Sequence, residues 1–133
     1  MDNPNNLQII QQMYQSFASG NKEALMNFFD PSVVWLEPGA PDIPFAGSFE
    51  GLSGIGKMFA LEAQYIKVTS FIPQSFCSSG DMVVVMGKDS VNVIPTGKTY
   101  STDWVQAFTL SNGKIIRIQV YMDTHAIAQA FMH

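Results

Sequence analysis

Residues 108–124 read FTLSNGKIIRIQVYMDT, and this stretch determines the class of fold. Apolar and polar residues alternate on both sides of Ser-Asn-Gly-Lys, a sequence typical of the tight turn between two antiparallel strands. The stretch therefore predicts a β-hairpin whose strands cover 98–110 and 115–122.

The same alternation extends upstream of the hairpin. It covers 66–77 and 82–94, and the short segments SSGD and PTG connect these stretches to each other and to the hairpin. Connections of this length join neighbouring antiparallel strands, so the pattern predicts a four-stranded meander. Gly87 interrupts the second strand and predicts a bulge or a sharp bend there.

The chain before residue 66 is mainly helical by its pattern. Apolar residues at spacings of three and four predict a first helix that ends at Gly20. Asn21 predicts the N-cap of a short second helix, which includes Phe28 and Phe29 and ends at Asp30-Pro31. The apolar positions of the first helix are Leu7, Ile10, Met13, Tyr14, Phe17 and Ala18.

Three further elements complete the predicted order. VVWLE at 33–37 predicts a strand, and the Pro/Gly-rich residues 38–51 predict a loop. Ser53 predicts the cap of a third helix, and Asp123 or Thr124 predicts the cap of a short last helix, HAIAQAFM. With helices grouped first and strands following, the sequence predicts one α+β domain over 1–133.

Composition limits the classes of function. The 133 residues are 47% hydrophobic, which is ample for one core, and a net charge of −4 without any Lys/Arg cluster argues against nucleic acid or anionic membranes as partners. Apolar runs are too short to span a bilayer and no signal peptide begins the chain, so a soluble cytoplasmic protein is expected. Cys77 is the only cysteine and there are two histidines, so no disulfide, metal site or cofactor is expected.

The order of elements resembles that of the nuclear transport factor 2-like superfamily, and within it the SnoaL-like and ketosteroid-isomerase-like proteins. The most specific segments are YQSFASGNKEALMNFF and FTLSNGKIIRIQVYMDT, and the resemblance covers Leu7 to Phe131. It implies a cone: a strongly curved, mostly antiparallel sheet wraps around three N-terminal helices and leaves a pocket at its wide end. It does not imply catalysis, since isomerases, hydrolases, cyclases and binding modules share this fold.

Glu37 is the main candidate for chemistry. Alternation places Val33, Trp35 and Glu37 on one strand face, and a carboxylate before a proline resembles the base of ketosteroid isomerases. Burial beside an indole is expected to raise the pKa of Glu37, unless Lys57 or Arg117 forms a salt bridge with it. The other interpretation is a solvated strand end.

Tyr14 and Gln106 occupy positions that resemble the oxyanion site of those isomerases. Tyr14 matches the tyrosine that donates to the oxyanion, but Gln106 falls near the position of a protonated aspartate that an amide cannot reproduce. This difference argues against steroid isomerisation. Tyr14 can equally be a core aromatic residue, and Asp123, a candidate acid or base, can equally cap the last helix.

Apolar side chains at alternating strand positions are expected to line the pocket. The interpretation that follows is a cofactor-free isomerase or hydrolase for a small, largely apolar molecule, with Glu37 as general base; the alternative is a ligand-binding or dimerisation module. A homodimer through the outer face of the sheet is also expected. The expected ligand-binding residues are Trp35, Trp104, Phe108, Ile118, Val120, Met122 and Phe59.

Overall fold

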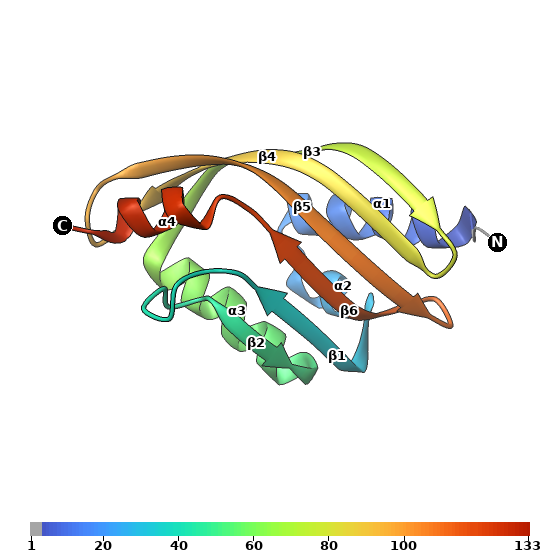
Figure 1. Ribbon diagram of the computed structural model, residues 1–133. Coiled ribbons are helices and arrows are strands. Elements are labelled where there is room, and N and C mark those ends of the chain that lie inside the picture. The colour runs from blue at the N-terminus through green and yellow to red at the C-terminus, as the bar shows by residue number, and fades with distance from the viewer. Residues whose placement is uncertain (1–3) are drawn as a thin grey trace.

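The computed structural model describes residues 4–133 and has the predicted α+β architecture (Figure 1). A strongly curved sheet of six strands arches over α1, α2 and α3, while α4 lies at the end of the sheet near β5 (Figure 1). The helices are α1 (Pro4–Ser19), α2 (Lys22–Met26), α3 (Gly51–Tyr65) and α4 (Thr124–Phe131). The strands are β1 (Phe29–Glu37), β2 (Gly47–Glu50), β3 (Ile66–Ser79), β4 (Met82–Val93), β5 (Thr99–Ser111) and β6 (Lys114–Tyr121).

The sheet has the order β2-β1-β6-β5-β4-β3. Its last four strands form the predicted antiparallel meander, and β1 joins the meander by pairing in parallel with β6. This pairing brings residues from the first strand of the chain next to residues from the last. The concave face therefore collects side chains from both ends of the sequence.

The predicted boundaries were wrong in the first half of the chain. The second helix ends at Met26, and Phe29 already belongs to β1, whose pairing with β6 is irregular between Phe29 and Val34. This irregular segment accommodates Pro31, which cannot donate a backbone hydrogen bond. The predicted loop contains the short strand β2, which pairs with the end of β1.

The third helix begins earlier than predicted. Its N-cap is Glu50, whose side chain makes no capping hydrogen bond, and Ser53 lies inside the helix. Gly51 has φ of +73°, a conformation that glycine adopts without strain, and it turns the chain from β2 directly into α3.

The predicted irregularity at Gly87 is present, on the neighbouring strand. The register of β3 against β4 shifts between Pro73 and Ser75, opposite Gly87. A side chain at Gly87 would collide with the indole of Trp104 and would place its Cβ 2.5 Å from the carbonyl oxygen of Ile72. Gly87 therefore makes the space in which the Trp104 ring lies against the sheet.

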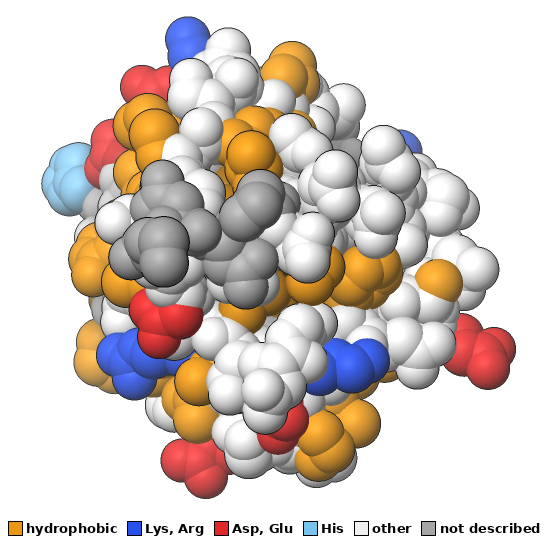
Figure 2. Space-filling model, turned by 90° about the vertical axis from the view of Figure 1, so that its right-hand side faces the viewer, with side chains coloured by type: hydrophobic (Ala, Val, Ile, Leu, Met, Phe, Trp, Pro, Cys, Tyr) orange, Lys and Arg blue, Asp and Glu red, His pale blue; other side chains and the backbone are white. Residues whose placement is uncertain are grey.

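The convex face of the sheet carries exposed apolar side chains. Met86, Val105 and Tyr121 lie in register on β4, β5 and β6, and Met86 and Tyr121 are exposed. Figure 2 shows a different side, the end of the molecule at the right of Figure 1, where apolar and uncharged side chains predominate and the lysines and arginines are scattered. The homodimer through the convex face stays a prediction.

Candidate active site

A cavity lies between the concave face of the sheet and the helices. Its volume is about 80 Å³, where one water molecule occupies about 10–15 Å³ by the same measure. Most of its wall is aromatic or aliphatic, with a few polar groups, as is typical of small-molecule sites. The lining residues are Met13, Tyr14, Phe17, Leu25, Phe29, Trp35, Glu37, Phe45, Phe59, Glu62, Ile66, Val68, Phe71, Asp89, Val91, Tyr100, Trp104, Gln106, Val120 and Met122.

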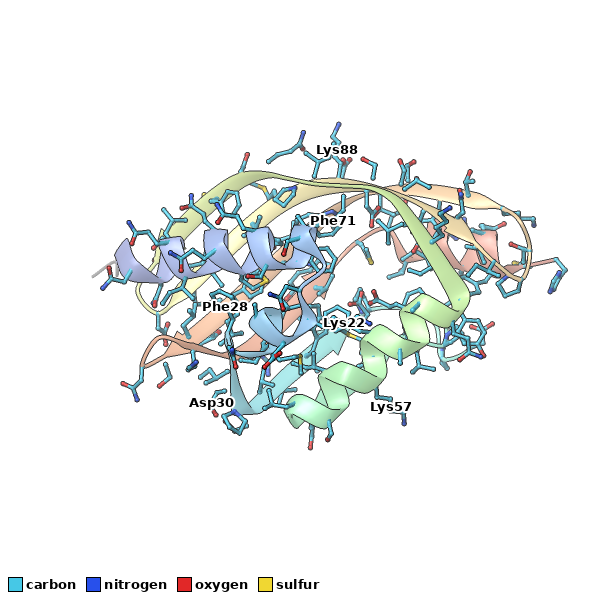
Figure 3. The ribbon with its side chains drawn as sticks, turned by 180° about the vertical axis from the view of Figure 1, so that it is seen from behind. Lys22, Phe28, Asp30, Lys57, Phe71 and Lys88 are labelled. Atoms are coloured by element: carbon cyan, nitrogen blue, oxygen red, sulfur yellow. The ribbon has the colours of Figure 1, made fainter. Side chains whose placement is uncertain are left out.

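A second cavity of about 210 Å³ shares part of this wall, and we call it the mouth. It lies between the α1–α2 turn, α3 and the start of β3, and it includes Lys22, which Figure 3 shows between α2 and α3. Glu62 borders both the inner cavity and the mouth. The residues common to both cavities are Phe17, Leu25, Phe59, Glu62, Ile66 and Val68.

Glu37 faces the cavity, as its position in the alternating strand predicted. Val33, Trp35 and Glu37 are buried, while Val34 and Leu36 on the opposite face are only partly buried. The indole Nε1 of Trp35 donates a hydrogen bond of 2.9 Å to Oε1 of Glu37. This bond fixes the direction of the carboxyl group. Neither Lys57 nor Arg117 pairs with it among the ion pairs of the described residues.

Tyr14 and Gln106 contact each other on another part of the wall. The Tyr14 hydroxyl donates to Oε1 of Gln106 at 2.5 Å, and burial raises the pKa of Tyr14. The register of the sheet places Val120 beside both Gln106 and the end of β1, so Gln106 and Glu37 lie two strands apart, about 10 Å between backbones. A small molecule can therefore contact Glu37 and Gln106 together.

Aromatic rings close the space around Tyr14. Phe71 stacks on Trp104 with ring centroids 4.7 Å apart and planes 11° apart. Figure 3 shows Phe71 beneath the sheet near the C-terminal end of α1, where its ring also packs 5.3 Å from that of Phe17. The Nε1 of Trp104 is buried without an acceptor among the residues the structure describes.

Two carboxyl groups that the sequence analysis did not select also line the cavity. Asp89, on β4, accepts hydrogen bonds at one oxygen from the backbone N (3.1 Å) and Oγ1 (2.6 Å) of Thr102. Glu62, on α3, is partly buried. Both had a signal in the sequence: Asp89 shares strand parity with Val83 and Val85, and Glu62 follows Met58 by four helical positions.

These carboxyl groups raise each other's proton affinity. Burial raises the pKa of Glu37 to about 7, against the opposing effect of the Trp35 hydrogen bond, and the charge of Asp89 adds to the rise. Burial together with the charges of Glu37 and Asp89 raises the pKa of Glu62 to about 8. Burial also raises the pKa of Asp89, against its bonds from Thr102. At neutral pH the cluster therefore holds part of its protons.

The remaining predicted site residues divide into two groups. Trp35, Trp104, Val120, Met122 and Phe59 line the cavity.

Phe108, Ile118 and Asp123 do not border the cavity. Phe108 and Ile118 are fully buried in the core, and the Phe108 ring packs edge-on against that of Tyr14, 6.0 Å between centroids. Asp123 instead caps α4, because its Oδ1 accepts from the backbone N of Ala126 at 3.0 Å. The predicted alternation was correct, but it could not show where the cavity ends and the packed core begins.

Residues 4–133 contain neither a metal-binding cluster of side chains nor a membrane-spanning helix. No group of three or more His, Cys, Asp or Glu side chains within this range has the geometry to hold a metal ion. No helix in the same range is both long and apolar enough to cross a bilayer.

Comparison with known proteins identifies the family. The model of the SnoaL-like domain matches residues 10–118. The chain belongs to this family. The resemblance to the nuclear transport factor 2-like superfamily is thereby confirmed, whereas no curated protein matches the chain.

Solved structures agree with this assignment. A nuclear transport factor 2-like protein from Burkholderia xenovorans LB400 is 27% identical, with 96% of each chain covered and a TM-score of 0.87. TerC, co-crystallised with polyporic acid, is 26% identical, with 95% of this chain and 97% of TerC covered and a TM-score of 0.82. A candidate isomerase from Rhodopseudomonas palustris is 17% identical, with 98% and 97% covered and a TM-score of 0.76, which shows the fold alone.

Proposed function

We propose that the chain is a cofactor-free enzyme that moves a proton on a small, largely apolar carbonyl compound, with Glu37 as the general base. The observation that carries the proposal is the carboxyl group of Glu37, which lies in an apolar cavity and is oriented by the Trp35 N–H. Burial raises its pKa to about 7, and a base with a pKa near the working pH is the most effective.

Gln106 supplies the complementary group. Its Oε1 accepts from Tyr14, so its Nε2 is available to donate to a ligand oxygen. In the proposed reaction on a β,γ-unsaturated ketone, Glu37 takes a proton from the carbon next to the carbonyl group, the electron pair of that C–H bond forms a C=C bond, and the π pair of the carbonyl moves onto the oxygen. Gln106 donates a hydrogen bond to this oxygen. Glu37 then returns the proton to a different carbon, and an isomer is released.

One relative supports a small-molecule role. TerC, 26% identical to this chain, was co-crystallised with polyporic acid. If Glu37 instead activates a bound water molecule, the same site performs hydrolysis. A binding module is the alternative from another class.

The test uses cyclohex-3-enone, whose conversion to the conjugated cyclohex-2-enone is followed by ultraviolet absorption, with larger β,γ-unsaturated ketones in parallel. Glu37→Gln keeps the shape of the side chain and removes the base, so kcat should fall about 10²–10⁴-fold with little change in KM. Glu50→Gln, at an exposed position, is the matched control and should leave the rate unchanged. Equal rates for Glu37→Gln and the unmodified chain would exclude the base, and no turnover of any ketone would favour the binding module.

A further inference from the structure

Four oxygen-bearing side chains converge at one end of the cavity, and we call them the carboxyl end. Glu37 comes from β1, Glu62 from α3, Asp89 from β4 and Tyr100 from β5, and all four line the cavity. They lie close enough that the charges of Asp89, Glu62 and Glu37 all act on the Tyr100 hydroxyl and add to the effect of burial in raising its pKa. Four separate helices and strands thus each contribute one polar side chain to the same part of the cavity wall.

The Tyr100 hydroxyl lacks a hydrogen-bond partner among the described residues. Its side chain is only 7% exposed, and no hydrogen bond joins its hydroxyl to any other residue in 4–133. The hydroxyl oxygen is not among the fully buried side-chain atoms that lack a partner, so it reaches the open space of the cavity, where an incoming group can bond to it. The position of Tyr100 in the cavity wall makes a bound molecule the natural partner.

The carboxyl groups around Tyr100 also have more acceptor capacity than donors. Glu37 receives one hydrogen bond, from Trp35, and Asp89 receives two, from Thr102, both at one oxygen. Glu62 receives none from the described residues. No lysine, arginine or histidine belongs to the cavity wall. Protons fill part of this acceptor capacity at neutral pH, and a group with several donors and a positive charge can replace them.

An ammonium group meets this requirement. It has three donors and no acceptor, and its charge opposes the repulsion among the carboxylates. Aromatic faces attract cations, and Trp35, Phe45 and Phe59 lie in the same wall. A metal ion is the poorer candidate, because no cluster in 4–133 has the geometry to coordinate one.

We propose that Glu62, Asp89 and Tyr100 at the carboxyl end bind the ammonium group of a small primary amine, whose apolar body passes Glu37 and lies along the aromatic wall toward Gln106. This inference deepens the proposed function and rests on it only for the place of the reacting carbonyl group, because the binding of an amine is measured without turnover. The substrate class is then an amine that carries a carbonyl group at its other end.

Isothermal titration at pH 7 in phosphate buffer tests the inference with three probes of one shape: 2-phenylethylamine, 2-phenylethanol and phenylacetate. The amine should bind about tenfold to a hundredfold more tightly than the alcohol, as expected for hydrogen bonds to charged partners, and the anion should bind most weakly. An alcohol that binds as tightly as the amine would overturn the proposal, and so would an amine without measurable binding at millimolar concentration.

Variants locate the effect. Glu62→Gln and Tyr100→Phe should each weaken the amine about tenfold and leave the affinity for the alcohol unchanged. Glu50→Gln removes the same charge from an exposed position and should change the affinity for the amine by less than about twofold, because solvent and salt screen distant charges. Equal losses in Glu62→Gln and Glu50→Gln would mean that net charge alone attracts the amine, and would overturn the assigned site.

The two proposals fail in different ways. Loss of the amine preference leaves the ketone assay and its Glu37→Gln comparison untouched. Conversely, full ketone turnover by the Glu37→Gln variant would refute the role of Glu37 as the base. The amine affinities would still test the binding of the ammonium group.

Discussion

Polar groups have different hydrogen-bond partners at the two ends of the cavity. One is the carboxyl end, and the other is the part of the wall around Tyr14, which we call the Tyr14 end. At the Tyr14 end, the Tyr14 hydroxyl donates to Gln106, and stacked rings of Phe71 and Trp104 fill the surrounding space. At the carboxyl end, three carboxyl groups and the Tyr100 hydroxyl have few donors among the described residues. The Tyr14 end pairs its hydroxyl with the Gln106 amide oxygen and leaves Nε1 of Trp104 without an acceptor among the described residues, whereas the carboxyl end leaves several acceptors without donors.

This difference separates structural roles from ligand-binding roles. A polar group that has a protein partner and tight packing contributes to folding and to the position of its partner. A buried acceptor without a donor lowers stability in the free protein and is compensated only by a proton or a ligand. The comparison thus predicts that mutations at the Tyr14 end mainly cost stability, while mutations at the carboxyl end mainly change ligand and pH dependence.

The largest expected effect is the loss of packing in Trp104→Ala. The Trp104 side chain is 1% exposed, stacks on Phe71 and occupies the space that Gly87 leaves open. Truncation of a buried tryptophan leaves a cavity, so the free energy of unfolding should fall by about 3–5 kcal/mol, measured by urea denaturation. A fall below about 1 kcal/mol would show that the Tyr14 end is not packed as a core.

The next effect concerns pH and the carboxyl end. The pKa of Glu37 is raised from 4.5 to about 7 and that of Glu62 from 4.5 to about 8, so the folded state holds protons that the unfolded state has released. The stabilising contribution of these two groups is therefore complete below about pH 4.5 and is lost as the pH rises through about 7 and 8. The free energy of unfolding should therefore fall over this interval, by less than the full shifts imply because Glu62 is partly exposed to solvent.

Glu62→Gln isolates this contribution. The variant lacks one titrating group and relieves Glu37 of its charge, so its stability should decline less between pH 5 and pH 8 in urea denaturation series. Other carboxyl groups affect both proteins equally and cancel in the difference. Parallel curves for the variant and the unmodified chain would mean that Glu62 titrates as in water, and the comparison between the two ends would lose its electrostatic basis.

The sequence predicted most of the fold and half of the site. Alternation in 98–122 gave the hairpin, and the strand VVWLE placed Glu37 inward as found. Strict alternation from Ile118 would also turn Ile116 inward, but the register of β5 against β6 shifts at this point and Ile115 is buried instead, a change that no sequence rule locates.

The carboxyl end depends on long-range contacts and was therefore hidden. Asp89 has the strand parity and Glu62 the helical position to face inward. However, one carboxyl group among apolar positions does not by itself predict a site. Only the curvature of the sheet and the approach of α3 to β1 bring these groups to Glu37. Convergence of this kind is a property of the folded chain.

The smallest expected effect distinguishes two roles for Tyr14. Ketosteroid isomerases use the matching tyrosine as a direct oxyanion donor, whereas here its proton is directed to Oε1 of Gln106 at 2.5 Å. Tyr14→Phe should therefore lower the free energy of unfolding by about 1–2 kcal/mol, because it leaves a partly buried amide oxygen without a donor.

In the ketone assay, a positioning role for Tyr14 predicts a loss of only a few-fold in kcat, because Gln106 can still donate from Nε2. Loss of a direct oxyanion donor instead costs about 10²–10³-fold in kcat. Tyr121→Phe removes a hydroxyl from a side chain that is 57% exposed on the convex face and should change neither stability nor rate. A Tyr14→Phe variant that loses about 10²-fold or more with unchanged KM would make Tyr14 itself the donor. The Tyr14 end would then be part of the reacting surface, and the contrast with the carboxyl end would hold for packing alone.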